Sequence, residues 1–287
     1  MDWLTVGALS LATWLTGNAL IRRGLAAPRL LPRHVPAGDD WRDVRLPTVR
    51  GKTLHAWYLP APTAGAPALV VMHGWGSNAE AMLPLQPPLQ EAGYGVLFVD
   101  ARCHGLSDDD RFTSLPRFAE DIEAALDWLV GQPGVDAAAL GVIGHSVGAA
   151  AALLVAARRP GLQAVVSLAA FAHPAAMMRR WLAARHIPYW PVGAYILAYV
   201  QRVIGARFDD IAPTTSIGRI TCPVLLVHGE ADDTVPLAEA REILAACGPA
   251  TVELLVVPGN HEHFAEADRH WPRLHAFLGR AFHGRPV

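Results

Sequence analysis

Short apolar runs that alternate with helical stretches constrain the fold of this 287-residue chain more than any other feature of its sequence. Apolar runs of the kind found in strands buried on both faces lie near 68–72, 95–99, 140–144, 164–168, 224–227 and 251–257. Helical stretches lie near 79–92, 116–130, 147–158, 236–247 and 263–282. This alternation predicts an α/β domain with a mostly parallel sheet, helices on both of its faces, and functional groups at the carboxyl ends of the strands.

Three segments follow one another along the chain. Residues 1–24 contain a long uncharged stretch with helical character, and three prolines make residues 25–39 a linker that no helix can continue through. Residues 40–287 form the predicted α/β domain. It opens with a hairpin whose strands lie near 43–50 and 53–59.

The alternation fails once, between about 171 and 220. Aromatic and basic residues recur there at helical rather than strand spacing. We expect a helical cap insertion that overhangs the active site, because insertions at strand ends are well placed to do so. Helices that simply pack on the sheet are the alternative.

Composition excludes several classes of protein. The chain is 52% apolar and only 17% charged, with a net charge of −2, which argues against disorder and against a nucleic-acid-binding surface. Cys103, Cys222 and Cys247 are too widely spaced to indicate a disulfide framework or a zinc site. The sequence contains no HExxH, EF-hand, GxGxxG or P-loop pattern, so we expect neither a metal nor a cofactor.

The N-terminal stretch Trp3–Ile21 carries no charge over 19 residues, and a helix of this length approaches the ~30 Å thickness of the bilayer hydrocarbon. Polar residues interrupt it at Thr5, Ser10, Thr13, Thr16 and Asn18. Positive charge follows it, at Arg22, Arg23, Arg29 and Arg33. We therefore expect a membrane anchor with the domain on the cytoplasmic side. An interfacial helix, a signal peptide and an ordinary docked helix are the alternatives.

A candidate nucleophile stands in the segment Gly144-His145-Ser146-Val147-Gly148. This GxSxG pattern follows an apolar strand and precedes an alanine-rich helix, which is the setting of a nucleophile elbow. The turn is so tight that side chains at the two glycine positions would collide with neighbouring backbone. We therefore expect Ser146 to project its hydroxyl into a site at the end of the strand.

A serine hydroxyl is a weak nucleophile at neutral pH, so it needs a base, and the base needs an orienting carboxylate. Two later strand ends supply candidates, Asp232 after 224–227 and His261 after 251–257. Asp233 and His263 are neighbouring alternatives, and we choose the first residue of each pair. The predicted triad is Ser146, His261 and Asp232.

These segments resemble the α/β-hydrolase superfamily over nearly the whole domain. The resemblance implies the α/β-hydrolase fold, and the pattern HGxxDxxVP at 228–236 places the acidic member on Asp232. The segment 73–78, which follows another strand, resembles the oxyanion loop of the family. By family position, the backbone N–H groups of Trp75 and Val147 would stabilise the oxyanion, and His73 would brace the loop.

A further segment, Asp100 to Ser107, resembles the DxRGHGxS turn of the superfamily, with Cys103 in place of the usual glycine. If this position needs a positive φ, cysteine is strained there. We expect the turn to be structural, with Asp100 and Arg102 joining loops through charge-assisted hydrogen bonds.

The resemblance implies a serine hydrolase, and we expect it to cleave carboxylic esters of small-molecule or lipid-like acyl substrates through an acyl-enzyme. Peptide hydrolysis, as in serine aminopeptidases, is the rival; it needs a carboxylate for the substrate ammonium, and the cap region offers only Asp209 and Asp210. A non-catalytic lipid-binding protein of the same fold is the alternative from another class. Aromatic and basic cap residues further predict that the cap faces the bilayer. The oligomeric state is left open.

Overall fold

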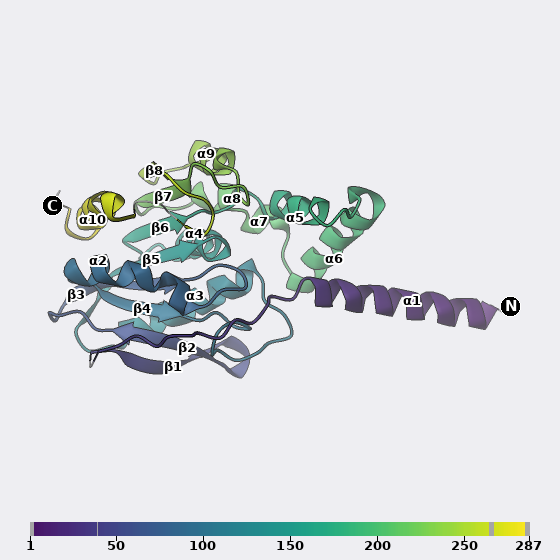
Figure 1. Ribbon diagram of the computed structural model, residues 1–287, viewed down its shortest axis with the longest axis horizontal. Helices are drawn as coiled ribbons and strands as arrows, with labels where there is room; N and C mark the ends of the chain where they lie inside the picture. The colour runs from purple at the N-terminus through teal and green to yellow at the C-terminus, as the bar shows by residue number, and fades with distance from the viewer. Residues whose placement is uncertain (1–2, 39, 264–266, 285–287) are drawn as a thin grey trace.

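The computed structural model describes residues 3–38, 40–263 and 267–284, and its centre is a twisted eight-stranded sheet (Figure 1). The strands follow one another across the sheet in the order β1-β2-β4-β3-β5-β6-β7-β8. Their bounds are β1 Arg42–Thr48, β2 Lys52–Leu59, β3 Ala66–Met72, β4 Gly95–Val99, β5 Val135–His145, β6 Ala164–Leu168, β7 Val224–Gly229 and β8 Val252–Val257. The prediction of an α/β-hydrolase fold is confirmed.

Strand direction changes only at one edge of this sheet. β1 pairs with β2, and β2 with β4, in antiparallel fashion, whereas the remaining neighbours from β4 to β8 are parallel. The predicted hairpin is therefore present, with the short 3-10 turn Val49–Gly51 between its strands. Because β3 and β5 to β8 run in the same direction, the loops that follow their carboxyl ends lie side by side at the same end of the strands.

The strand sequences are continuous apolar runs because both faces of the sheet are buried. In β3, Val70 and Met72 belong to one core cluster, and Leu69 and Val71 to the other. Successive side chains point to opposite faces of a sheet, so a strand covered on both sides must be apolar throughout. The sheet is thus the middle of three layers.

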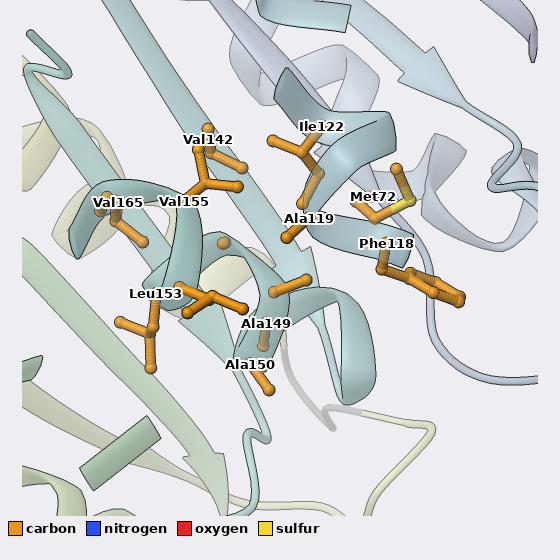
Figure 2. Packing of buried hydrophobic residues seen from close by; sticks show 14 of the residues in the cluster. Met72, Phe118, Ala119, Ile122, Val142, Ala149, Ala150, Leu153, Val155 and Val165 are labelled. Carbon is orange, nitrogen blue, oxygen red and sulfur yellow. The ribbon is translucent and has the colours of Figure 1, made fainter. Parts of the chain in front are cut away.

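Helices supply the outer layers. Their bounds are 3-10 helix Ala79–Leu85, α2 Gln86–Glu91, α3 Leu115–Val130, α4 Val147–Arg158, α5 Pro174–Ala183, π-helix Tyr189–Gly193, α6 Ala194–Ile204, α7 Phe208–Ile211, α8 Pro213–Ile217, α9 Leu237–Ala245 and α10 Ala267–His283. Figure 2 shows Phe118, Ala119 and Ile122 of α3 and Ala149 of α4 in one buried cluster with Met72 and Val142 of the strands. The other face carries α2 and α10. Prolines split the helix predicted over 79–92 into a 3-10 and an α-helical part.

The region 171–220, predicted as a cap, contains α5 to α8. Figure 1 shows α5 and α6 standing away from the sheet beside the base of the N-terminal helix α1, whereas α8 packs against α4. Trp190 is 78% exposed, and Tyr189 and Tyr195 are each just under half exposed. Aromatic packing on the sheet therefore does not account for these three residues.

Helix α1 spans Trp3–Gly24 and projects from the body of the molecule (Figure 1). No helix within the described residues is both long and apolar enough to cross a bilayer, so the structure does not support the spanning anchor expected from the sequence. Polar residues such as Thr13, Thr16 and Asn18 and the glycines of α1 dilute its apolar content. The helix itself is present, as expected.

Candidate active site

Ser146 occupies the sharp turn between β5 and α4. Its backbone adopts φ 54° and ψ −116°, a conformation that is costly for any residue with a side chain. A Cβ atom on Gly144 would lie 2.3 Å from the carbonyl oxygen of Gly148, and one on Gly148 would lie 2.4 Å from that of His73. Both glycines of the motif are therefore required by close backbone approach, as the sequence predicted.

His261 lies between Ser146 and Asp232. Its Nε2 is 2.9 Å from the Ser146 hydroxyl oxygen, and its Nδ1 is 2.8 Å from Oδ2 of Asp232. All three residues are buried, each less than 10% exposed. The arrangement has the geometry needed for the imidazole to accept the serine proton while the carboxylate orients the ring.

The backbone after β7 holds Asp232 in place. Its Oδ1 accepts hydrogen bonds of 2.7 Å from the N–H of Val235 and 3.0 Å from that of Thr234. Asp233 is exposed, and its carboxylate bonds to the hydroxyl of Thr234. His263 is also exposed, and its backbone N–H donates to Asn260. The structure thus brings the first member of each ambiguous pair to Ser146 and leaves the second outside.

Two histidines that the sequence analysis did not select support this arrangement. The Nε2–H of His145 donates a 2.8 Å hydrogen bond to the carbonyl oxygen of His261. The Nε2–H of His228 donates to the carbonyl of Val235 at 2.7 Å and lies 3.4 Å from Oδ2 of Asp232. Their positions inside the GxSxG and HGxxDxxVP segments were the only sequence signal for either residue.

Trp75 and Val147, the expected oxyanion donors, line the same cavity as Ser146. Val147 is the first residue of α4, and the first backbone N–H groups of a helix have no partner within it. The Trp75 side chain is 42% exposed and stacks on Phe118, with ring centroids 6.4 Å apart. The Trp75 side chain therefore both packs against Phe118 of α3 and borders the cavity.

Two neutral histidines anchor the loop that carries Trp75. The N–H of Gly76 donates to Nε2 of His104, and the N–H of Ala101 donates to Nε2 of His73, both at 3.0 Å. Burial lowers the pKa of His73 to about 4 and also lowers the pKa of His104. The rings therefore stay unprotonated at neutral pH and can accept these bonds, so His73 braces the loop as expected.

The turn after β4 is held as the resemblance implied. Asp100 accepts from the N–H groups of Ala79 and Leu106, and Arg102 pairs with Asp121 at 2.7 Å. Cys103 adopts a φ of 66°, so the cysteine occupies a position that favours glycine. Its sulfur contacts the backbone of Asp110.

A cavity of about 670 Å³ opens above Ser146. Most of its lining is apolar, and α5 and α6 contribute Met177, Met178, Trp181 and Val200. The acidic residues among its lining are already paired: Asp109 lies 2.6 Å from Arg29, and Asp110 lies 3.5 Å from Arg102. Within the described residues, no cluster of histidine, cysteine and carboxylate side chains is arranged to hold a metal ion.

The segment predicted as a linker forms one wall of this cavity, a role that the sequence analysis missed. Residues 24–29 line it, and Pro28 lies so close to Gly76 that a Cβ there would approach it to 2.8 Å. Arg29 fixes the segment by donating to the carbonyls of Gly105 and Ser107 at 2.9 and 2.8 Å. The prolines were the only sequence signal that this segment has an extended, ordered backbone.

The sheet topology and the Ser146–His261–Asp232 geometry together define a hydrolase of the α/β fold. The family model described as serine aminopeptidase, S33, matches residues 65–204. An uncharacterized protein of Mycobacterium tuberculosis is 32% identical over 233 residues, which cover 78% of this chain and 72% of the relative.

Solved structures share this fold. An esterase of Pyrococcus furiosus superposes with a TM-score of 0.72 at 22% identity, covering 90% of this chain and 97% of the other. The protein Est1E of Butyrivibrio proteoclasticus, solved with ferulic acid bound, gives a TM-score of 0.66 at 22% identity, with 83% and 98% covered. The chain belongs to the α/β-hydrolase superfamily and is a hydrolase.

Proposed function

We propose that this protein hydrolyses carboxylic esters through an acyl-enzyme formed on Ser146. The observation that carries the proposal is the position of the His261 ring, within hydrogen-bond distance of both the Ser146 hydroxyl and Asp232 beneath a largely apolar cavity. Similarity to an esterase of known structure supports the same reaction.

In the proposed mechanism, Ser146 Oγ attacks the ester carbonyl while His261 Nε2 takes the hydroxyl proton. The N–H groups of Trp75 and Val147 stabilise the oxyanion, and loss of one such donor costs on the order of 3 kcal/mol. His261 then gives its proton to the leaving alcohol as the carbon–oxygen bond breaks. Water attacks the acyl-enzyme with His261 again as base, which releases the acid and restores Ser146.

The cavity favours an apolar acyl group. Met177, Met178 and Trp181 border it, and thioether and aromatic side chains accommodate acyl chains of varied shape. We therefore expect turnover to increase from acetate to medium-chain esters.

Peptide hydrolysis is the second candidate, because the matching family model is described as serine aminopeptidase. Recognition of a substrate ammonium needs an available carboxylate near Ser146. Asp209 pairs with His173 and Arg207 and is not among the residues lining the cavity, and Asp109 and Asp110 already face arginines. This distribution of charge favours ester over aminopeptidase substrates.

A fluorophosphonate probe and p-nitrophenyl esters test the proposal together. The parent should label covalently and hydrolyse the butyrate ester, and Ser146→Ala should lose labelling and lower kcat by a factor of about 10⁵ to 10⁶. A lipid-binding protein without catalysis would not label at all. Parallel assays with aminoacyl p-nitroanilides would favour the peptidase if these were the better substrates.

A further inference from the structure

Helix α1 exposes large apolar side chains on several sides. Trp3 is 92% exposed, and Leu11, Trp14, Leu15 and Leu20 are each more than half exposed. Between Trp3 and Ile21 the helix carries no charged residue. An uncharged helix that is apolar on several sides is normally covered, so its exposure points to a partner.

Only the C-terminal part of α1 is tied to the body by the contacts the structure describes. Tyr195 donates to Asn18 at 2.9 Å, and Arg22 donates to the hydroxyl of Tyr199 at 2.6 Å. Ile21 and Leu25 pack against the core. The rest of α1 projects past α6 and away from the sheet (Figure 1).

Charge is divided unequally between this end of the molecule and the rest. Residues 1–29 and 171–211, here called the basic end, contain eight arginines and three acidic residues, for a net charge of +5. The remaining residues carry −7, although the whole chain is close to neutral at −2. The apolar side chains of α1 therefore lie on the same end as the positive charge.

Several arginines of the basic end contact aromatic rings. A ring carries no net charge, so these contacts do not neutralise the positive charge of the guanidinium groups. Arg22 lies over the ring of Tyr199, Arg179 over Tyr189, and Arg185 over Trp181, at 5.9, 4.6 and 3.7 Å from the ring centroids. Arg29, Arg180 and Arg207 differ, because they pair with Asp109, Glu239 and Asp209. Arginine and aromatic side chains together favour the polar boundary of a bilayer.

The basic end also contributes part of the cavity lining. Arg22, Arg185, Tyr199 and Trp181 are part of its lining, together with residues 24–29. A surface that covered α1 and α6 would therefore lie beside residues that line the cavity containing Ser146.

We propose that the basic end docks on an anionic phospholipid bilayer. The apolar side chains of α1 enter the outer part of one leaflet without crossing it, and the arginines contact the lipid phosphates. In this position the cavity faces the membrane and receives acyl esters from it; that last step rests on the proposed function. Docking itself rests on charge, exposure and placement alone.

Vesicle flotation of the full chain tests the docking. Vesicles of phosphatidylcholine alone are compared with vesicles containing phosphatidylglycerol, and we expect binding chiefly to the anionic ones, weakened by 0.5 M salt. The double variant Arg23→Glu/Arg202→Glu should lose roughly fivefold or more in binding for each charge. Trp14→Glu should also weaken binding. The matched controls are Arg241→Glu on α9 and Val130→Glu at the end of α3, both at exposed positions outside the basic end.

Circular dichroism melting and butyrate ester turnover without vesicles establish that each variant is folded. Equal flotation with both kinds of vesicle, no flotation, or equal losses in the controls would overturn the docking. The docking would also be overturned if the parent did not bind lipid but formed a dimer that Trp14→Glu dissociates. A second copy of the chain would then cover α1. A parent that floats but hydrolyses no ester would retain the docking and refute the proposed function instead.

Discussion

The imidazole of His145 donates a hydrogen bond of 2.8 Å to the backbone carbonyl oxygen of His261. The residue preceding the candidate nucleophile thus holds the loop that carries the candidate base, although β6 and β7 lie between their strands. Burial lowers the pKa of His145, so the ring is neutral and has a single N–H, which this bond uses. His145 is therefore a positioning residue for His261.

Removal of this bond should reduce catalysis more than substrate binding. We expect His145→Phe to lower kcat for the butyrate ester by about 100-fold with little change in KM, because small displacements of a catalytic group are costly. His145→Gln keeps an N–H donor and should recover part of the rate. Steady-state kinetics with melting temperatures measure both, and equal kcat values for parent and His145→Phe would refute the positioning role.

The two adjacent carboxylates should differ sharply in their effect on turnover. Asp232→Asn leaves the shape of the site but removes the charge that orients His261, so we expect kcat to fall about 10⁴-fold. Asp233→Asn, at an exposed position, should remain within about twofold of the parent. If both variants lost activity equally, Asp232 would have no special role as the orienting acid.

Local pattern explains why the candidate nucleophile could be predicted from sequence. The strand, the tight turn and the helix around Ser146 are contiguous, and the glycines that the turn requires stand at fixed offsets from the serine. The same holds for Asp232 and His261, because each follows an apolar strand directly. Three parallel strand ends then bring these residues together without further information.

Long-range contacts explain what the sequence did not predict. The wall formed by residues 24–29 depends on Arg29 reaching the carbonyls of Gly105 and Ser107, nearly 80 residues away. Nothing local in the proline-containing segment indicates this contact. The expectation of a membrane-spanning α1 rested on helix length, absence of charge and the arginines that follow; the apolar content of the helix, lowered by residues such as Thr13 and Asn18, does not support it.

Acid should destabilise the fold through His73. Its pKa is about 4 in the folded protein, against an ordinary value of 6.5, so the unfolded chain binds a proton as pH falls while the native ring does not. The resulting stability is present above pH 6.5 and is lost as pH falls from 6.5 toward 4, by about 2 kcal/mol between pH 7 and pH 5. Urea unfolding at both pH values measures it. His73→Gln should lose less stability over the same interval, and a parent with no loss would contradict the assignment.

Cys103 should carry backbone strain that glycine would relieve. Its φ of 66° places Cβ in an unfavourable position, whereas glycine adopts this conformation freely. Cys103→Gly and Cys103→Ala both remove the sulfur contacts with Asp110, so their difference isolates the strain. We expect the glycine variant to exceed the alanine variant by about 1 kcal/mol in free energy of unfolding. An alanine variant of equal or greater stability would show that the turn tolerates a side chain.

Arg29 should control how well the cavity accommodates long acyl groups. Its guanidinium fixes residues 24–29 against the turn that contains Gly105, and release of that wall would loosen one side of the cavity without touching Ser146. We expect Arg29→Ala to raise KM for an octanoate ester about tenfold, which corresponds to the loss of roughly one charge-assisted contact. The value of kcat/KM for an acetate ester should stay within about twofold of the parent. Arg33→Ala is the matched control, because Arg33 contacts Glu80 through its backbone N–H and not through its side chain. An equal loss on both esters would mean that Arg29 acts on the whole fold, and no loss on either would mean that the wall does not contact the acyl group.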